Sequence, residues 1–260
     1  MNNIFFTADN HFSHRNIALY CMRSPWIYDN PDYDPTKQYH FKFNNSKAVN
    51  IKAHDEALIE NWNKVVNSGD IVYILGDFAF KDHNHYLMAL HGKKILILGN
   101  HDKASQIVYN NFTEVHEFGC RKRIEGYDIT LCHYALRTWA SSCHNSFSLF
   151  GHSHGRMPEF NNMLSFDVGV DVWGYAPIPW EVVLEKMTQK MEWVRKNGKV
   201  FVDGESRADG LYDKHPSQRV IDTRMKNKEI MIKMGCAIDE IMWPASLPIK
   251  NACQRENIDD

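Results

Sequence analysis

Five short apolar runs in this sequence are each followed at once by aspartate, asparagine or histidine. The runs contain four or five residues, mostly β-branched, leucine or aromatic, and begin at Ile4, Ile71, Ile95, Ile129 and Phe147. Runs of this kind, bounded by glycine and polar residues, are typical of buried β-strands. Ligands in layered α/β folds bind just beyond the carboxyl ends of strands. We therefore expect the five runs to bring their polar residues to one convergent site.

Two amphipathic helices are expected around these strands. Apolar residues between positions 48 and 66 recur at spacings near three, four and seven, and Asn67-Ser68-Gly69 ends that segment. A second helix is predicted from near Pro179, a residue favoured in a first helical turn, to about Asn197, with Gly198 as its stop. Strands that alternate with helices indicate an α/β (α+β) protein with a substantial central sheet.

The composition is that of an ordinary globular protein. Hydrophobic residues make up 43% and charged residues 24% of the 260 positions, which excludes a disordered or fibrous chain. Thirty basic and thirty-two acidic residues give a formal charge of −2. No generic nucleic-acid groove and no anionic-membrane surface are expected at this charge. Histidine is the unusual residue type, with fourteen copies.

The amino terminus and the cysteines favour a cytoplasmic location. The first residues lack a basic segment, and their apolar run is too short for a signal peptide. No stretch approaches about 18 uninterrupted apolar residues, so no membrane-spanning helix is expected. The six cysteines are scattered without a CxxC pair, which favours free thiols over a disulfide framework.

The polar residues that follow the runs are suited to divalent metal ions. They are Asp9, His11, Asp77, Asn100, His133, His152 and His154. Carboxylates, imidazoles and an amide suit ions of intermediate hardness, such as Mn²⁺, Fe²⁺, Zn²⁺, Co²⁺ or Ni²⁺. This set exceeds what one first-row ion needs, but it fits two ions if one carboxylate bridges them.

The spacing of the ligands adds two expectations about the backbone. Residues two apart on a strand point to the same side. The pair at positions 9 and 11, and the pair at 152 and 154, are therefore each expected to share an ion if the chain there is extended. Glycine precedes a ligand at Gly76, Gly99 and Gly151, which allows tight turns that bring the backbone close to the ions.

Five ordered motifs carry a resemblance to a known family. The motifs are Asp9-x-His11, Gly76-Asp77, Gly99-Asn100-His101-Asp102, His133 and Gly151-His152-x-His154. In this order they resemble the motifs of the calcineurin-like metallophosphoesterase superfamily, over roughly residues 4–185. The strings from Ala8 to Ile17, Gly69 to Ala79 and Asp167 to Asp171 resemble its small bacterial and phage branch. The resemblance implies a four-layer sandwich of two mixed β-sheets flanked by helices, with a dinuclear metal site at the strand ends.

The resemblance also implies a role for each motif residue. One ion would be held by Asp9, His11, Asp77 and His154, and the other by Asp77, Asn100, His133 and His152. A metal-bridging hydroxide would then attack phosphorus while His101 acts as general acid, and Asp102 would orient His101. Two divalent transition-metal ions are the implied cofactors, with Mn²⁺ as the first candidate and Fe, Zn, Ni or Co as alternatives.

The first hypothesis for function is a dimetal phosphodiesterase acting on a small phosphoester, which could be nucleotide-derived. A nuclease or phosphomonoesterase of the same superfamily is the alternative. A non-catalytic scaffold with this fold belongs to a different class, and the complete ligand set argues against it. Phosphoprotein phosphatases of the superfamily carry an arginine shortly after the Gly-Asp motif, where this chain has Phe78-Ala79-Phe80-Lys81. That departure argues against a phosphoprotein substrate.

Four residues near the motifs are candidate substrate contacts: Arg15, His14, Arg137 and His144. The two guanidinium groups could hold a phosphate through their planar forks. Residues 29–45 are rich in aromatic residues, proline, aspartate and asparagine, and are expected to form a long loop. That loop could stack on a base or an aryl leaving group, or pack on its own aromatic rings.

The sequence divides into a metallophosphoesterase domain, residues 1–197, and a C-terminal extension, residues 198–260. Within the extension, the segment from Lys199 to Val202 is expected to form a strand and that from Ser217 to Met234 a helix. An extra edge element, a lid and an oligomer contact are equally open roles for it.

Overall fold

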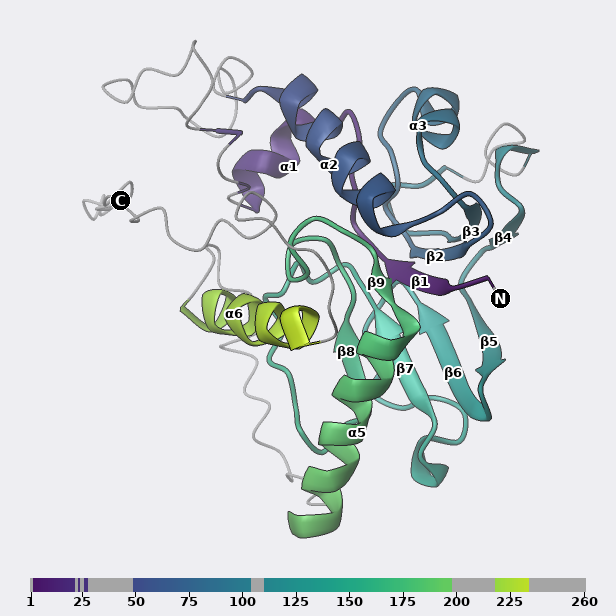
Figure 1. Cartoon of the computed structure of the whole chain (residues 1–260), viewed down its shortest axis with the longest axis vertical. Coiled ribbons are helices and arrows are strands. Elements are labelled where there is room, and N and C mark those ends of the chain that lie inside the picture. The colour runs from purple at the N-terminus through teal and green to yellow at the C-terminus, as the bar shows by residue number, and fades with distance from the viewer. Residues whose placement is uncertain are drawn as a thin grey trace, which may run out of the picture.

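The computed structural model describes residues 2–21, 23, 26–27, 49–103, 110–197 and 218–233, with the backbone alone for 218–224. This part of the chain is α/β, as predicted, and contains two mixed β-sheets and several helices (Figure 1). The expected loop at 29–45 and the expected strand at 199–202 lie outside the described residues.

The first sheet contains four of the strands in parallel and one antiparallel strand at its edge. Its order in space is β4 (Glu114–His116), β3 (Lys93–Ile97), β2 (Ile71–Leu75), β1 (Ile4–Thr7) and β9 (Ile178–Pro179). The parallel strands β1, β2 and β3 include three of the five predicted runs, so the residues that follow these runs leave the sheet at the same edge.

The second sheet begins with a hairpin and continues with parallel strands. Its order is β5 (Gly119–Ile124), β6 (Tyr127–Cys132), β7 (Phe147–Phe150) and β8 (Ser165–Asp167). The two-residue turn between β5 and β6 has positive φ angles at Glu125 and Gly126, 48° and 89°. Such a turn matches the twist of the two strands that it joins.

The helices are α1 (Arg15–Tyr20), α2 (Ile51–Val65), α3 (His83–Ala89), α5 (Trp180–Asn197) and α6 (Gln218–Lys233). Three of the helices agree with segments predicted from the sequence, and two, α1 and α3, were not predicted. The side chain of Asn50 accepts a hydrogen bond from Ala53 N–H, 3.1 Å long, and so caps the start of α2. The predicted helices that start after Ala48, near Pro179 and near Ser217 are confirmed as α2, α5 and α6.

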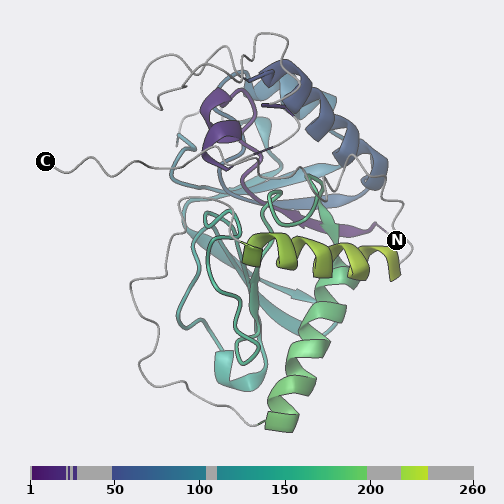
Figure 2. The same ribbon diagram turned by 90° about the vertical axis from the view of Figure 1, so that its left-hand side faces the viewer.

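The first sheet is buried on both faces. Along β2, Tyr73 and Leu75 point into a core shared with strands of the second sheet, whereas Val72 and Ile74 point into a core that contains Trp62 of α2. Figure 2 shows the helices α1 and α2 on one side of the first sheet and the second sheet on its other side. Burial on both faces explains why β2 is a continuous apolar run without polar alternation.

Helix α6 packs on the preceding part of the chain. Met231 is fully buried in the core that the two sheets share. Asn227 accepts a hydrogen bond from Lys186 Nζ (3.2 Å) and donates one to the carbonyl of Val172 (3.0 Å). The helical part of the predicted extension therefore contacts α5 and the loop after β8, and the boundary at residue 197 stays a prediction.

Two further expectations concern thiols and membranes. The four cysteines within the described residues, Cys21, Cys120, Cys132 and Cys143, are free, as predicted. Burial raises the pKa of the Cys120 thiol to about 11, so this thiol is protonated at neutral pH. Among the helices of the described segments, none combines the length and the apolarity required to cross a membrane.

Candidate metal site

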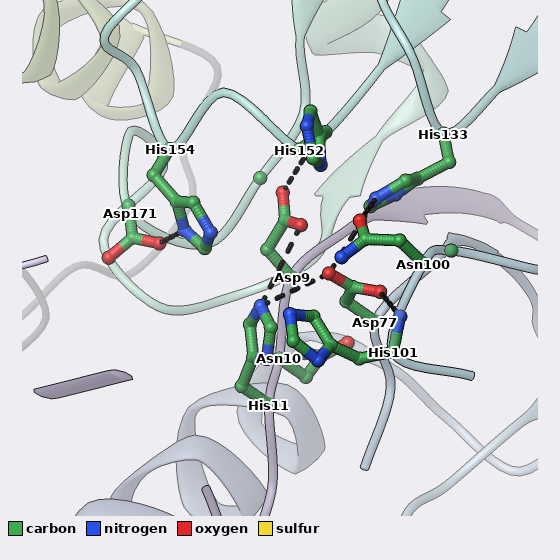
Figure 3. A network of polar contacts seen from close by, with 12 residues as sticks. Asp9, Asn10, His11, Asp77, Asn100, His101, His133, His152, His154 and Asp171 are labelled. Carbon is green, nitrogen blue, oxygen red and sulfur yellow. Dashed lines mark hydrogen bonds and ion pairs between the residues drawn. The ribbon is translucent and has the colours of Figure 1, made fainter. Parts of the chain in front are cut away.

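Five loops meet where the two sheets adjoin, and they bring the seven predicted ligands together (Figure 3). The loops follow β1, β2, β3, β6 and β7, and they carry Asp9 and His11, Asp77, Asn100, His133, and His152 and His154. Positions up to 145 residues apart in sequence, from Asp9 to His154, thus line one small volume.

The ligands form two groups. The ligand atoms of Asp9, His11 and His154 all lie within 4.8 Å of one another, and the same holds for Asp77, His133 and His152. Asn100 Oδ1 lies 3.0 Å from His133 Nε2 and so adjoins the second group. This division is the one that the resemblance implies for two ions.

Asp77 lies between the two groups. Its Oδ2 is 3.4 Å from His11 Nε2 and 3.6 Å from His133 Nε2, so one carboxylate oxygen faces a histidine of each group. Its other oxygen, Oδ1, accepts a 2.8 Å hydrogen bond from the backbone N–H of His101. The Asp77 carboxylate is therefore placed where a bridging ligand between two ions would be needed.

The backbone at the ligands is not extended, and this corrects one expectation. Asp9, His11, His152 and His154 have φ angles of 57°, 53°, 66° and 49°, in the left-handed region. His152 and His154 also belong to different groups. Strand alternation therefore does not bring the ligands together; tight left-handed turns do. A non-glycine residue held in this region costs about 1–3 kcal/mol, so surrounding contacts must stabilise it.

Arg23 stabilises the first of these turns. It is fully buried, and its guanidinium donates to the carbonyls of Asp9 (2.7 Å) and Asn10 (3.0 Å). It also forms a bidentate pair with Asp171, at 2.9 and 2.8 Å, and its Nη1 lies 3.0 Å from His54 Nε2. All five guanidinium N–H groups therefore have a partner, which is what a buried arginine requires.

Asp171 connects this arginine to a ligand. Its Oδ2 lies 2.6 Å from His154 Nδ1, which fixes the proton on Nδ1 and directs Nε2 toward the first group. Burial alone would raise the pKa of Asp171, but Arg23 and His154 hold it far below its usual range. Cys21, His154 and Asp171 form a third group whose ligand atoms lie close together. The two carboxylate oxygens of Asp171 are, however, already bonded to Arg23 and His154.

Two more carboxylates, both partly buried, stabilise the other turns. Asp167 accepts hydrogen bonds from Ser153 Oγ (2.5 Å), Gly155 N–H (3.0 Å) and Gly169 N–H (2.7 Å), and so holds the turn that carries His152 and His154. The carboxylate of Asp102 accepts hydrogen bonds from the backbone N–H groups of Asp77 (2.7 Å), Phe78 (3.0 Å) and Gly99 (2.8 Å).

The contacts of Asp102 differ from the role that the resemblance implies for it. The expected partner was the ring of His101, but the carboxylate instead joins the loop after β2 to the loop after β3. The physical reason is that both loops present backbone N–H groups at the strand ends, and one carboxylate between them satisfies three of these groups at once. Asp102 is therefore a positioning residue for Asp77.

Ring hydrogen bonds orient other histidines toward the same volume. His133 Nδ1 lies 2.7 Å from the carbonyl oxygen of Leu75, which only accepts, so Nδ1 carries the proton and Nε2 faces the site with its lone pair. His11 Nδ1 lies 3.1 Å from Nδ1 of His14, and its Nε2 faces Asp77. An imidazole held in this way presents a ready ligand atom to a metal ion.

The electrostatics of the site also fit cations. Burial raises the pKa of Asp9 well above its usual value, and it raises that of Asp77. Burial lowers the pKa of His11 and of His133, so these rings are neutral at pH 7. Asp9 Oδ1 and His11 Nε2 are buried without a hydrogen-bond partner. Because unpaired buried polar atoms are costly, divalent ions between these carboxylates and imidazoles would satisfy them.

Glycine is required where the loops come closest. A Cβ atom at Gly99 would lie 2.2 Å from Asp77 Oδ1, and one at Gly76 would lie 2.3 Å from His133 Nδ1. A Cβ at Gly151 would lie 2.7 Å from Asp9 Oδ2. The glycines that were expected to allow close approach therefore adjoin the ligand side chains themselves.

This packing makes Gly99→Ala a sharp test of the site geometry. The new methyl group must displace the Asp77 carboxylate, so we expect metal affinity to fall by at least about 10-fold, the scale found when a ligand's support is lost. Titration calorimetry with Mn²⁺ measures this change. Gly69→Ala is the matched control, because its Cβ would meet only the flexible side chain of Asn2, at 3.3 Å. Equal affinities of the two variants would contradict the geometry.

The remaining predicted residues lie at different places. His101 is exposed, and its ring centroid is 5.4 Å from that of His11. The ring centroid of His14 lies 5.1 Å from that of His11. The pKa of His14 is lowered to about 4, chiefly by burial. Arg15 is exposed at the start of α1, one residue after His14.

Arg137 and His144 lie in the chain between β6 and β7. Arg137 is exposed and lines a cavity of about 190 Å³ whose wall also includes Met157, Phe160 and Asn227. His144 ends the short 3₁₀ helix η2 (Ser142–His144), with its Nδ1 3.1 Å from Cys143 Sγ. Of the four candidate substrate contacts, His14 is thus the one with a direct ring contact to a ligand.

Sequence reasoning missed several residues that position the ligands. Asp167 and Asp171 lie in a string that carries part of the resemblance, yet no role follows from that string. Arg23 lies in a segment without any motif, and no local pattern distinguishes it from a surface arginine. Its part in the site depends on contacts with residues up to 148 positions away.

Comparison with known proteins supports the fold. No family model matches this chain. The uncharacterized protein MJ1445 of Methanocaldococcus jannaschii is 29% identical over 208 residues, which cover 75% of this chain and 96% of that protein. The Gene 66 protein of Mycobacterium phage D29 is 26% identical over 217 residues, covering 71% of this chain and 96% of the relative.

A solved structure is also similar. The crystal structure of AQ665 from Aquifex aeolicus, a protein of unknown function, has a TM-score of 0.50 and 23% sequence identity. The likeness covers 71% of this chain and 99% of that one. The names of these proteins state no activity, so the similarities concern the shared fold.

Proposed function

We propose that this chain is a dimetal-dependent phosphoester hydrolase of the calcineurin-like metallophosphoesterase superfamily, with that superfamily's four-layer sandwich. One observation carries the proposal. Within each of two adjoining groups the ligand atoms lie within 4.8 Å of one another, and Asp77 Oδ2 lies within 3.6 Å of a histidine from each group. A structural site for one ion would not need a second group or a central carboxylate.

The donor set supports a pair of transition-metal ions. Asp9, His11 and His154 would hold one ion, His133, His152 and Asn100 the other, and Asp77 both. Nitrogen and oxygen donors of this kind suit Mn²⁺, the first candidate, and also Fe, Zn, Ni or Co. When bound, such a pair of ions supplies charge neutralisation to phosphate oxygens and lowers the pKa of water at neutral pH.

His101 is the residue best placed to act on the leaving group. Its ring is exposed beside the ligand His11, and its backbone N–H is bonded to Asp77. In the proposed reaction the oxygen of water forms a bond to phosphorus, and the bond from phosphorus to the ester oxygen breaks. His101 gives a proton to that ester oxygen, which leaves as an alcohol, and the proton of the attacking water passes to solvent.

A metal-dependent activity screen tests the proposal. The protein is depleted of metal, reloaded with Mn²⁺, and assayed on aryl phosphate monoesters, aryl phosphodiesters, cyclic nucleotides and oligonucleotides. We expect Mn²⁺-dependent hydrolysis, with diesters above monoesters. Higher monoester activity would instead identify a phosphomonoesterase, and salt-sensitive oligonucleotide cleavage a nuclease. A protein that binds no transition metal and hydrolyses none of these esters would contradict the proposal.

His101→Ala should lower kcat by about 10²–10⁴-fold, the usual contribution of a general acid, while bound metal stays unchanged. The loss should be larger for a phenyl ester than for a nitrophenyl ester, whose leaving group needs less protonation. Steady-state kinetics on the two esters measure the difference. His85→Ala, which removes another exposed histidine from α3, is the control and should keep wild-type rates. An equal loss on both esters would argue against a proton-donor role.

A further inference from the structure

Phe80 presents an exposed aromatic ring at the rim of the candidate site. Half of its surface, 50%, is accessible, although it follows the metal-ligand candidate Asp77 by only three residues. Its ring stacks on that of His14, with centroids 4.7 Å apart and an interplanar angle of 11°. Its centroid is 6.4 Å from that of His101. An apolar ring therefore lies beside the proposed proton donor.

Hydrogen bonds between main-chain groups hold the backbone of Phe80 in place. The N–H of Phe80 donates a 2.8 Å hydrogen bond to the carbonyl of Phe12, and the N–H of Phe12 donates a 3.0 Å bond to the carbonyl of Phe78. Phe12 and Ala79 also form an isolated parallel β-bridge. One face of the ring is covered by His14, so the accessible half of Phe80 is available to another molecule.

The chemistry of the rim distinguishes the two ends of the site. Tyr134, 37% exposed, lies with its ring centroid 4.9 Å from those of His133 and His152, and so adjoins the second ligand group. Phe80 instead adjoins the side of His14 and His101. A phenyl ring cannot bind a phosphoryl oxygen, but it does bind another planar ring by offset or edge-to-face stacking.

We propose that Phe80, stacked on His14, is the subsite for a planar aromatic leaving group. The inference rests on the proposed function, because it places the leaving group of the hydrolysed ester where His101 can protonate it. The preferred substrates are then phosphodiesters whose departing alcohol carries an aromatic ring, such as a phenol or a base-bearing alcohol. Phe80, three residues after Asp77, thus selects for an aromatic group.

A pair of esters with equal chemistry and different shape tests this subsite. Phenyl methyl phosphate and hexafluoroisopropyl methyl phosphate have leaving groups of similar acidity, and only the first is planar. We expect Phe80→Leu to lower kcat/KM for the phenyl ester by about tenfold, as the loss of a ring stack predicts, and for the fluoroalkyl ester by less than about twofold. Phe80→Tyr keeps the ring and should retain the wild-type preference.

A control and a second readout separate the possible failures. Phe118→Leu removes a 66% exposed ring just before β5 and should leave both rates unchanged. Binding of phenyl methylphosphonate, followed by NMR, should show ring-current shifts of the phenyl protons that Phe80→Leu abolishes. Equal losses on both esters, or unchanged shifts in the variant, would overturn the subsite alone. Absence of turnover by the wild-type protein on every ester would overturn the proposed function.

Discussion

Asp77→Asn is expected to abolish most activity and to remove at least one of two bound metal ions. The Asp77 carboxylate is the group within 3.6 Å of a histidine from each ligand cluster, and it is almost fully buried. The amide has the same shape but no charge, and its NH₂ group cannot act as a ligand. We expect kcat/KM to fall by at least about 10³-fold, equivalent to about 4 kcal/mol of transition-state stabilisation.

Metal analysis and kinetics on the same preparation decide this prediction. Elemental analysis should give two ions per wild-type chain and one or none in the variant. Asp82→Asn is a suitable control, because Asp82 is exposed and its left-handed backbone, φ 55°, is one that asparagine adopts readily. An Asp77→Asn variant that retains two ions and wild-type turnover would exclude Asp77 as a bridging ligand and would contradict the dimetal proposal.

Arg23→Leu is expected to lower the free energy of unfolding of the metal-free protein by about 3–5 kcal/mol. The substitution removes a fully buried guanidinium and all of its hydrogen bonds at once. It leaves the Asp171 carboxylate without its bidentate pair and the carbonyls of Asp9 and Asn10 without donors. Because those carbonyls belong to the left-handed turn that carries Asp9, the turn loses its main support.

Urea denaturation of the metal-free protein measures the stability change, and Mn²⁺ titration measures the consequence for the site. We expect metal affinity to fall by about 10–100-fold, since Arg23 also orients His154 through Asp171. Arg23→Lys keeps the charge but has three donors instead of five, so an intermediate loss is expected. Arg121→Leu, at an exposed arginine of β5, should change stability by less than about 0.5 kcal/mol. A loss below about 1 kcal/mol for Arg23→Leu would contradict this account.

The strands and helices follow closely from the local sequence. The runs starting at Ile71 and Phe147 coincide with β2 and β7, and the predicted helix from near Pro179 to Asn197 is α5. Apolar periodicity determines these elements because each one buries a face against a neighbour, and that requirement is written in a window of a few residues. Strands β1 and β3 end at Thr7 and Ile97, each one residue before the end of the apolar run, which extends to Ala8 and to Leu98.

The set of candidate ligands also follows from the sequence alone. Because parallel strands end at the same edge of a sheet, neighbouring parallel strands that each end in a ligand-type residue direct those residues to neighbouring places. The order of β1, β2 and β3 in one sheet and of β6 and β7 in the other meets that condition. Local pattern and sheet geometry together therefore predict which candidate ligands each sheet presents, and the tertiary structure brings the two sets together.

Only the tertiary structure decided how those residues are held in place. The separation of His152 and His154 into different groups depends on left-handed turns, and such turns exist because distant groups stabilise them. Arg23 acts on Asp9 and on Asp171, 148 residues further along the chain, and Asp102 joins two separate loops. A local sequence pattern encodes which side chains a strand presents, whereas the partners of a buried charge are chosen by packing between segments far apart in the chain.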